Sequence, residues 1–159
     1  MKKLVTITWF ALVLSLIVGC EDSVQPSHFE YTKLFSGEVS KTWKMKSIAF
    51  KNVGDPDWTL TVPCWADEQY TFNRDKEKKF EVKSGNNKCD PDEEPYDIID
   101  TWSYNSAAAA LYFVHPLFSE SPIPFTVKEV DKNSMTLELY FDDGAIQSYQ
   151  LKFESISEN

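Results

Sequence analysis

The stretch that decides the fold is Met135-Thr136-Leu137-Glu138-Leu139-Tyr140-Phe141. Its odd-numbered residues are apolar and the residues between them are mostly polar, the period of two that is typical of a half-buried β-strand. A second run in the same phase, Tyr149-Gln150-Leu151-Lys152-Phe153, follows after Asp142-Asp143-Gly144. A three-residue loop with glycine at its left-handed third position pairs residue 141 with residue 145, so that odd positions face odd positions. We therefore predict an antiparallel hairpin.

The same alternation recurs upstream of this hairpin. Around Trp43 and Met45 apolar and polar residues alternate, and the phase then slips to Ile48 and Phe50, which indicates a β-bulge near Ser47. The other alternating segments are marked by Tyr70 and Phe72, Phe80 and Val82, Ile98 to Tyr104 through Trp102, Leu111 and Phe113, and Phe125 and Val127. We predict an all-β chain, an antiparallel up-and-down barrel of about eight strands. A β-sandwich is the alternative.

Two short stretches depart from the alternation. Residues 28–36 are predicted to form one short helix, because Ser27 and Glu30 have capping-box spacing and Gly37 stands where a helix would stop. Two roles stay open for this segment: a plug at one end of the barrel, or an irregular linker. Ala107–Ala110 has helical propensity but is too short to stand alone, so we interpret it as a turn between strands.

The N-terminus is typical of a secretory signal. Lys2-Lys3 precedes an apolar run over residues 4–18, which is short for a permanent span of about 20 residues. Ile17-Val18-Gly19-Cys20 resembles a lipobox, the motif at which bacterial lipoproteins are acylated on cysteine and cleaved just before it. The resemblance implies a signal peptide over residues 1–19, a lipid on Cys20 such as palmitate, and membrane attachment through that lipid. Residues 20–37 then form the lipidated tether and short helix, and residues 38–159 the barrel.

The residues after Cys20 indicate which membrane the chain is expected to be attached to. Glu21-Asp22 resembles, in part, the surface-export signal of lipoproteins in the Bacteroidetes group, which implies the outer membrane or the cell surface. Asp22-Ser23-Val24 resembles the three-residue O-glycosylation motif of the same group. The expected location is therefore the bacterial cell envelope, with the chain anchored by its lipid.

Length and charge restrict the partners. The chain has 159 residues, enough for one domain, with 16 basic and 25 acidic residues. Without the leader and its two lysines, 14 basic and 25 acidic residues remain, a net charge of −11. This charge excludes nucleic acid as a partner, because phosphates repel it. Colloidal solubility is the simpler interpretation of the acidity, and a cation-binding surface is the alternative.

Two further cysteines, Cys64 and Cys89, form an even pair in an oxidising compartment, so one disulfide is predicted. Two free thiols or half of a metal site are the other interpretations. With only His28 and His115 besides, a zinc site is poorly supported, and we predict no metal and no cofactor.

The order of these landmarks resembles that of lipocalin-like lipoproteins of the Bacteroidetes. The resemblance covers about residues 38–156 and rests on the lipobox and on these segments: Lys41-Thr42-Trp43-Lys44-Met45, Cys64-Trp65-Ala66-Asp67-Glu68-Gln69-Tyr70-Thr71-Phe72, Lys88-Cys89, Thr101-Trp102-Ser103-Tyr104, Phe125-Thr126-Val127 and Met135-Thr136-Leu137-Glu138-Leu139. Lys41-Thr42 precede Trp43, where true lipocalins have Gly-x-Trp. The resemblance implies a cup-shaped barrel and an apolar ligand of unspecified identity.

Catalytic motifs are missing from the sequence. No serine lies in Gly-x-Ser-x-Gly, and no glycine-rich phosphate loop is present. His115 precedes Pro116 at a strand end and is interpreted as a rim or core residue. The acidic loop, residues 90–97, carries Asp90, Asp92, Glu93, Glu94 and Asp97; it lacks the spacing of an EF-hand, so a solvated loop is favoured over a Ca²⁺ site. A carboxylate pair for glycoside hydrolysis depends on distances that sequence does not give. We predict that the chain is not an enzyme.

Two functions of different class remain. In the first, the barrel binds a small apolar or amphipathic ligand, lined by Trp43, Phe72, Phe80, Trp102 and Tyr104. In the second, the same aromatic residues fill the barrel, and the chain is an accessory subunit or inhibitor that contacts an envelope protein through outer loops, above all the acidic loop.

Overall fold

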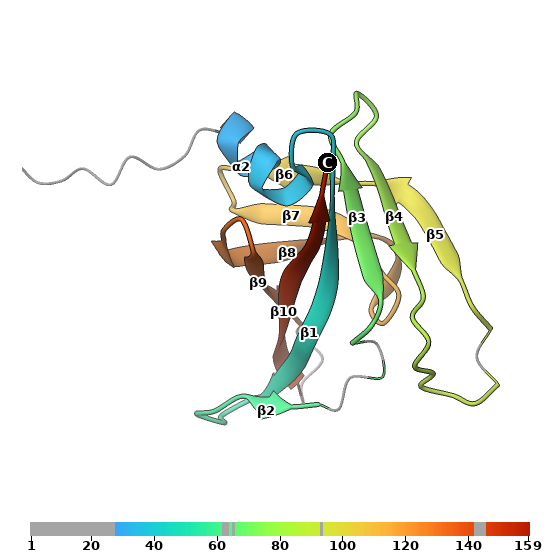
Figure 1. The fold of residues 1–159 in the computed structure, drawn as a ribbon. Helices are drawn as coiled ribbons and strands as arrows, with labels where there is room; N and C mark the ends of the chain where they lie inside the picture. The colour runs from blue at the N-terminus through green and yellow to red at the C-terminus, as the bar shows by residue number, and fades with distance from the viewer. Residues whose placement is uncertain (1–27, 62–63, 65, 93, 142–145) are drawn as a thin grey trace, which may run out of the picture.

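The computed structural model describes residues 28–61, 64, 66–92, 94–141 and 146–159. Within these residues one helix and ten strands follow one another (Figure 1): α2 (His28–Ser36), β1 (Ser40–Asn52), β2 (Thr59–Leu60), β3 (Gln69–Asn73), β4 (Lys79–Lys83), β5 (Asp97–Thr101), β6 (Ser103–Asn105), β7 (Ala110–His115), β8 (Ser119–Val130), β9 (Ser134–Tyr140) and β10 (Ile146–Glu158). The predicted signal peptide, Cys20, residues 21–27, Glu93 and the loop 142–144 lie outside the described residues.

The strands form an antiparallel up-and-down meander. The hydrogen-bonded order is β5-β4-β3-β1-β10-β9-β8-β7-β6, and β2 pairs with β1 off this path. The first and last strands pair with each other, with Met45 opposite Phe153, so the two ends of the meander meet. The result is a nearly closed barrel of nine strands, which confirms the predicted all-β barrel over the sandwich.

The barrel changes direction at Trp102. The alternation predicts one strand from Ile98 to Tyr104, and its inward phase is correct, but the chain breaks it into β5 and β6. The Trp102 N–H donates to the Lys78 carbonyl oxygen at 2.9 Å, ending the ladder with β4, and β6 then pairs with β7. The two halves of this segment thus pair with different strands, β5 with β4 and β6 with β7. The position of the bend depends on these long-range pairings, which sequence periodicity does not encode.

The β-bulge predicted near Ser47 is present in β1. Its register against β10 shifts between Met45, opposite Phe153, and Ser47, opposite Lys152. This extra residue lets Met45 and Ile48, which are out of phase in the sequence, both face the core, where each is 1% exposed.

The β9–β10 hairpin has the predicted parity and a different register. Leu137 lies opposite Leu151, whereas a three-residue loop continued without a bulge would place Leu137 opposite Tyr149. The predicted pairing is therefore wrong by two residues. A shift of two keeps every side chain on its own face, so burial of the odd residues does not discriminate between the two registers.

The helix forms at the predicted positions and plugs one end of the barrel. It ends at Gly37, whose φ of 63° is left-handed and whose N–H donates to the Lys33 carbonyl at 2.8 Å. Phe35 is fully buried, and its ring lies 5.0 Å from that of Tyr104 and 6.3 Å from that of Trp102. Among the described residues, none of the helices combines the length and the apolar character that a membrane crossing requires.

The segment before β7 forms the predicted turn. Ser106–Ala109 connect β6 to β7, the Ala109 N–H donates to the Ser106 carbonyl at 3.4 Å, and Ala109 has a left-handed φ of 48°.

Candidate functional site

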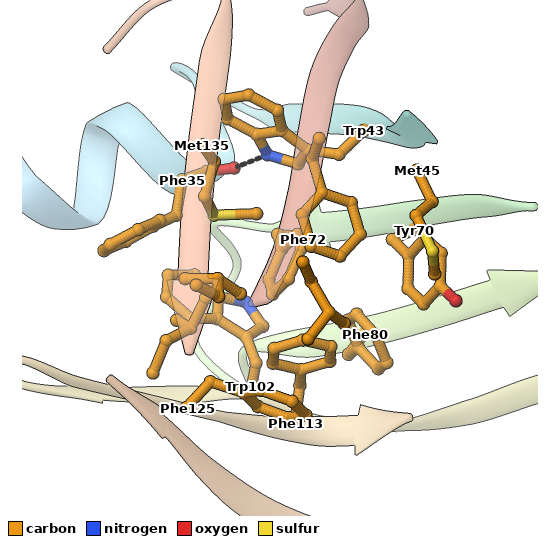
Figure 2. Packing of buried hydrophobic residues seen from close by; sticks show 14 of the residues in the cluster. Phe35, Trp43, Met45, Tyr70, Phe72, Phe80, Trp102, Phe113, Phe125 and Met135 are labelled. Atoms are coloured by element: carbon orange, nitrogen blue, oxygen red, sulfur yellow. Dashed lines mark hydrogen bonds between the residues drawn. The ribbon is translucent and has the colours of Figure 1, made fainter. Parts of the chain in front are cut away.

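The five residues predicted to line a ligand cavity lie together at the helix end of the barrel. Trp43, Phe72 and Phe80 are fully buried, Trp102 is 3% exposed, and Tyr104 is partly buried. The Phe72 ring lies 4.8 Å from that of Phe80 and 5.5 Å from that of Trp102 (Figure 2). These rings contact one another directly, so at this level of the barrel the space between the strands is occupied by the chain's own aromatic side chains.

Further aromatic rings continue this filling along the barrel. Phe113 is fully buried, 5.3 Å from Phe80 and 4.4 Å from Phe125 between ring centroids. At the end remote from α2, the turn after β7 brings Phe118 over the interior, 4.9 Å from His115 and 4.9 Å from Tyr149. The described part of the barrel is therefore packed from the helix plug to the β7–β8 turn.

A polar network is buried within this aromatic core. His115 and Tyr70 are fully buried and Glu68 is 2% exposed. The Leu117 N–H donates to Nδ1 of His115 at 3.3 Å, which leaves the proton of the neutral ring on Nε2. Nε2 lies 3.3 Å from the Tyr70 hydroxyl, and that hydroxyl donates to Oε2 of Glu68 at 2.5 Å. Each group in this chain thus donates to the next: the Leu117 N–H to His115, His115 to the Tyr70 hydroxyl, and the Tyr70 hydroxyl to the Glu68 carboxyl group.

Tyr96, which precedes β5, donates its hydroxyl hydrogen to the other carboxyl oxygen of Glu68. The network therefore joins β3, β7 and the end of the acidic loop. Burial holds the pKa of His115 down at about 3, so this ring is neutral at physiological pH. Burial, and then the neighbouring Glu68, raise the pKa of Tyr70 well above its ordinary value. Neither group is poised to exchange a proton near neutral pH, which is the property a general acid or base needs.

The sequence singled out His115 and missed its partners. The structure confirms His115 as a core residue. Glu68 directly precedes β3 and Tyr70 is its second residue, and side chains two residues apart along an extended backbone point to the same, inner face. A carboxyl group at an inward position is the signal that could have predicted a buried polar partner there.

The space beside Glu68 is small. A hollow of about 20 Å³ lies between Glu68, Ser84, Lys88 and Glu94. That volume holds about one water molecule. It is too small for an organic ligand.

A larger hollow lies on the outside, between α2 and β8. It has a volume of about 250 Å³, and its lining includes Tyr31, Tyr104, Val127 and Val130. Tyr104 is therefore the one predicted ligand-binding residue that both contacts the core and lines this outer hollow.

The loop between β4 and β5 is tied to the barrel at its beginning. Cys64 and Cys89 lie at disulfide distance, with their Cα atoms 5.1 Å apart. The Asp67 carboxylate accepts the N–H groups of Asn86 at 2.6 Å and Asn87 at 3.0 Å. The acidic loop that follows is exposed to solvent at Asp90, Asp92, Glu94 and Asp97. Within the described ranges, no group of three or more histidine, cysteine or acidic side chains is arranged to hold a metal ion.

Lys41 fastens the helix plug to the barrel. Its side chain is 1% exposed, and its Nζ donates to the Leu34 carbonyl at 3.2 Å and to the Lys132 carbonyl at 2.7 Å. Nζ also lies 3.5 Å from a Glu158 carboxylate oxygen and 4.3 Å from the centre of the Trp43 ring. Burial lowers the pKa of the Lys41 ammonium below its ordinary value, while Glu158 opposes that shift. One cation thereby connects α2, the β8–β9 turn and the last strand.

Comparison of the chain with protein-family models, with curated proteins and with solved structures finds no match. The functional argument therefore rests on the geometry described above.

Proposed function

We propose that this chain is a lipid-anchored protein of the bacterial cell envelope, attached through Cys20, that binds another envelope protein through its outer surface and has no catalytic activity. The observation that carries the proposal is the packed interior. Trp43, Phe72, Phe80 and Phe113 are fully buried against one another, so the barrel serves as a rigid scaffold. A rigid scaffold with exposed loops suits protein binding, because little conformational entropy is lost on association.

The position of the anchor supports the acidic loop as the contact surface. Figure 1 shows α2 at one end of the barrel and the β4–β5 loop toward the other end. Residues 21–27, between the lipid and α2, span at most about 25 Å when extended. A lipid on Cys20 therefore keeps the helix end near the membrane and leaves the acidic loop facing away from it, accessible to partners.

Photocrosslinking in intact cells tests this function. A crosslinking amino acid at the exposed position Asp92 should give a reproducible protein adduct, whereas the same amino acid at Ala107, exposed at the helix end, should not. The triple variant Asp90→Asn, Asp92→Asn, Glu94→Gln should weaken association at unchanged fold, because these side chains are exposed. The absence of any reproducible adduct from position 92 would exclude the acidic loop as the contact.

A second function, binding of a small apolar or amphipathic ligand, is favoured by the hollow between α2 and β8. This is also the activity that the resemblance to lipocalin-like lipoproteins implies. The hollow between α2 and β8 has a volume of about 250 Å³, just below the usual range for ligand pockets, about 300–1,000 Å³. Native mass spectrometry of protein from its own host decides between the two, because a bound ligand adds mass. Loss of that mass in Tyr104→Ala would place the ligand in this hollow.

A further inference from the structure

β5 is an edge strand of the barrel. It pairs with β4 from Lys79 opposite Thr101 to Lys83 opposite Asp97. The hydrogen-bonded order of the sheet ends at β5, and within the described part of the chain no ladder forms along its second edge. Figure 1 shows β5 at the outer margin of the sheet.

The hydrogen bonds at the two ends of the β4–β5 pairing identify which residues face this free edge. The Ser84 N–H donates to the Tyr96 carbonyl at 3.0 Å, and the Trp102 N–H donates to the Lys78 carbonyl at 2.9 Å. In an antiparallel pair, only alternate residues exchange backbone hydrogen bonds with the neighbouring strand. The even-numbered residues of β5 therefore bond to β4, and the odd-numbered ones direct their N–H and C=O groups outward.

The outward residues are Asp97, Ile99 and Thr101, and all three are exposed. The Thr101 N–H is already occupied, because it donates to the Asp100 carboxylate at 2.6 Å. Asp97 and Ile99 together offer two N–H and two C=O groups, which form one complete repeat of an antiparallel ladder. Ile99 adds an apolar side chain that is 66% exposed.

We infer that the free edge of β5 at Asp97 and Ile99 is a strand-addition site for an extended, basic segment of a partner protein. The inference rests on the proposed function and specifies its partner. Unpaired backbone groups along an edge recognise an extended backbone, whereas the neighbouring side chains select among sequences.

The charge of the edge decides which strand fits. From Cys89 to Thr101 the chain has acidic residues and no lysine or arginine. A second copy of this chain would bring the same excess of acidic residues to the edge, and this like charge opposes edge-to-edge dimers. Asp97, which lies opposite Lys83 of β4, and the acidic loop before it would instead attract lysine or arginine on a partner strand. The occupant is therefore a different protein that contributes a basic strand.

Selection from a library of peptides of about ten residues, displayed on phage, tests the inference with the full-length protein in detergent. The enriched peptides should be basic and should carry an apolar residue two positions from a lysine or arginine, because Asp97 and Ile99 lie on one face of β5. On binding, they should slow hydrogen exchange at the amides of Asp97 and Ile99. Their affinity should fall steeply between about 0.1 M and 1 M salt, because screening weakens the charge contribution.

Two variants at the edge separate backbone recognition from side-chain effects. Ile99→Pro removes an N–H that does not bond to β4, so the barrel should stay folded, and binding should weaken at least about tenfold. Ile99→Thr keeps the N–H and should bind within about threefold of the wild type. Asp97→Lys leaves the backbone intact and should abolish selection of basic peptides, which keeps the test valid if Ile99→Pro folds poorly.

Three outcomes would overturn the inference: no enrichment, enrichment of peptides without basic residues, or equal binding by Ile99→Pro. The crosslinking experiment under Proposed function gives an independent result. A cellular adduct from position 92 that persists in Ile99→Pro would leave the proposed function intact and refute strand addition at β5. If no cellular adduct forms and β5 still captures basic peptides, the proposed function is refuted and strand addition at β5 is retained.

Discussion

The indole N–H of Trp43, on β1, donates a hydrogen bond of 2.8 Å to the carbonyl oxygen of Phe35, in the last turn of α2 (Figure 2). Both residues are fully buried. The carbonyls of a helix's last turn have no partner within the helix, so this bond supplies one and holds the plug against the barrel. The contact joins α2 to the core of the protein.

Trp43→Phe should therefore loosen the plug. The substitution keeps an aromatic ring but leaves the Phe35 carbonyl without its donor, which should lower the free energy of unfolding by about 1–3 kcal/mol. Hydrogen exchange should become faster in α2 than in β9. Trp102→Phe is the matched control, because it removes an indole bond to the Asn73 carbonyl, on β3. Equal exchange of α2 in both variants would contradict the assignment.

Phe113→Ala should open a cavity in the barrel. Phe113 is fully buried, and its loss should cost about 3–5 kcal/mol in the free energy of unfolding. An apolar cavity of this kind binds small apolar molecules, so xenon or benzene should bind the variant and leave the wild-type interior untouched. Calorimetry and ¹²⁹Xe NMR measure this. Wild-type protein that binds these probes in its interior as well as the variant does would show that the barrel is not filled.

Acid should destabilise the protein through His115. The folded-state pKa of His115, about 3, lies below the ordinary value of 6.5, so between these values the unfolded chain binds a proton that the folded chain does not. Stability from this group is complete above about pH 6.5 and is lost as the pH falls toward 3, by about 1.4 kcal/mol per pH unit. Urea unfolding at pH 7 and pH 4.5 should give a smaller difference in His115→Gln than in the wild type. Equal pH dependence in both would refute this role.

Reduction of the Cys64–Cys89 pair should destabilise the loop that precedes β5. Closing about 26 residues contributes about 3.5 kcal/mol on the chain-entropy model. The double variant Cys64→Ser, Cys89→Ser should unfold at lower urea and expose residues 90–96 to faster hydrogen exchange. Intact mass before and after reduction provides the first check. A mass that is unchanged by reduction would show that both thiols are free in the mature protein.

Cys20→Ser should abolish lipid attachment. A serine has no thiol for the acyl donor, and the peptidase that cleaves before the lipobox cysteine acts after acylation, so the variant should keep its leader. Wild-type protein should partition into detergent, because each buried CH₂ of acyl chain contributes about 0.8 kcal/mol. Metabolic labelling with a fatty-acid analogue measures the result. Equal labelling of both proteins would show that Cys20 is not the acylation site.

Patterns along the chain predicted the local structure correctly where neighbouring residues decide it. The helix over His28–Ser36, the bulge near Ser47 and the inward phase of Met135, Leu137 and Leu139 all agree with the structure. Helix stop signals and the period of two act over a few residues, so they can be read without knowing which strands are neighbours.

Features that depend on partners distant in the chain were not predicted. The alternation continues through Trp102, yet the strand breaks there because β4 ends and β7 becomes the neighbour. Phe118 has no place in any alternating run, yet it covers the barrel end beside His115.

The sequence by itself determined which side chains face inward, because a strand places successive side chains on opposite faces. Only the tertiary structure decided what those side chains do. It brought Glu68, Tyr70 and His115 into one buried network, packed Phe72 and Phe80 into the space a ligand would need, and left Asp97 and Ile99 on an unpaired edge. The physical reason is that alternation defines a face, whereas the distance across a barrel and the neighbour of each strand depend on contacts between residues far apart in the chain.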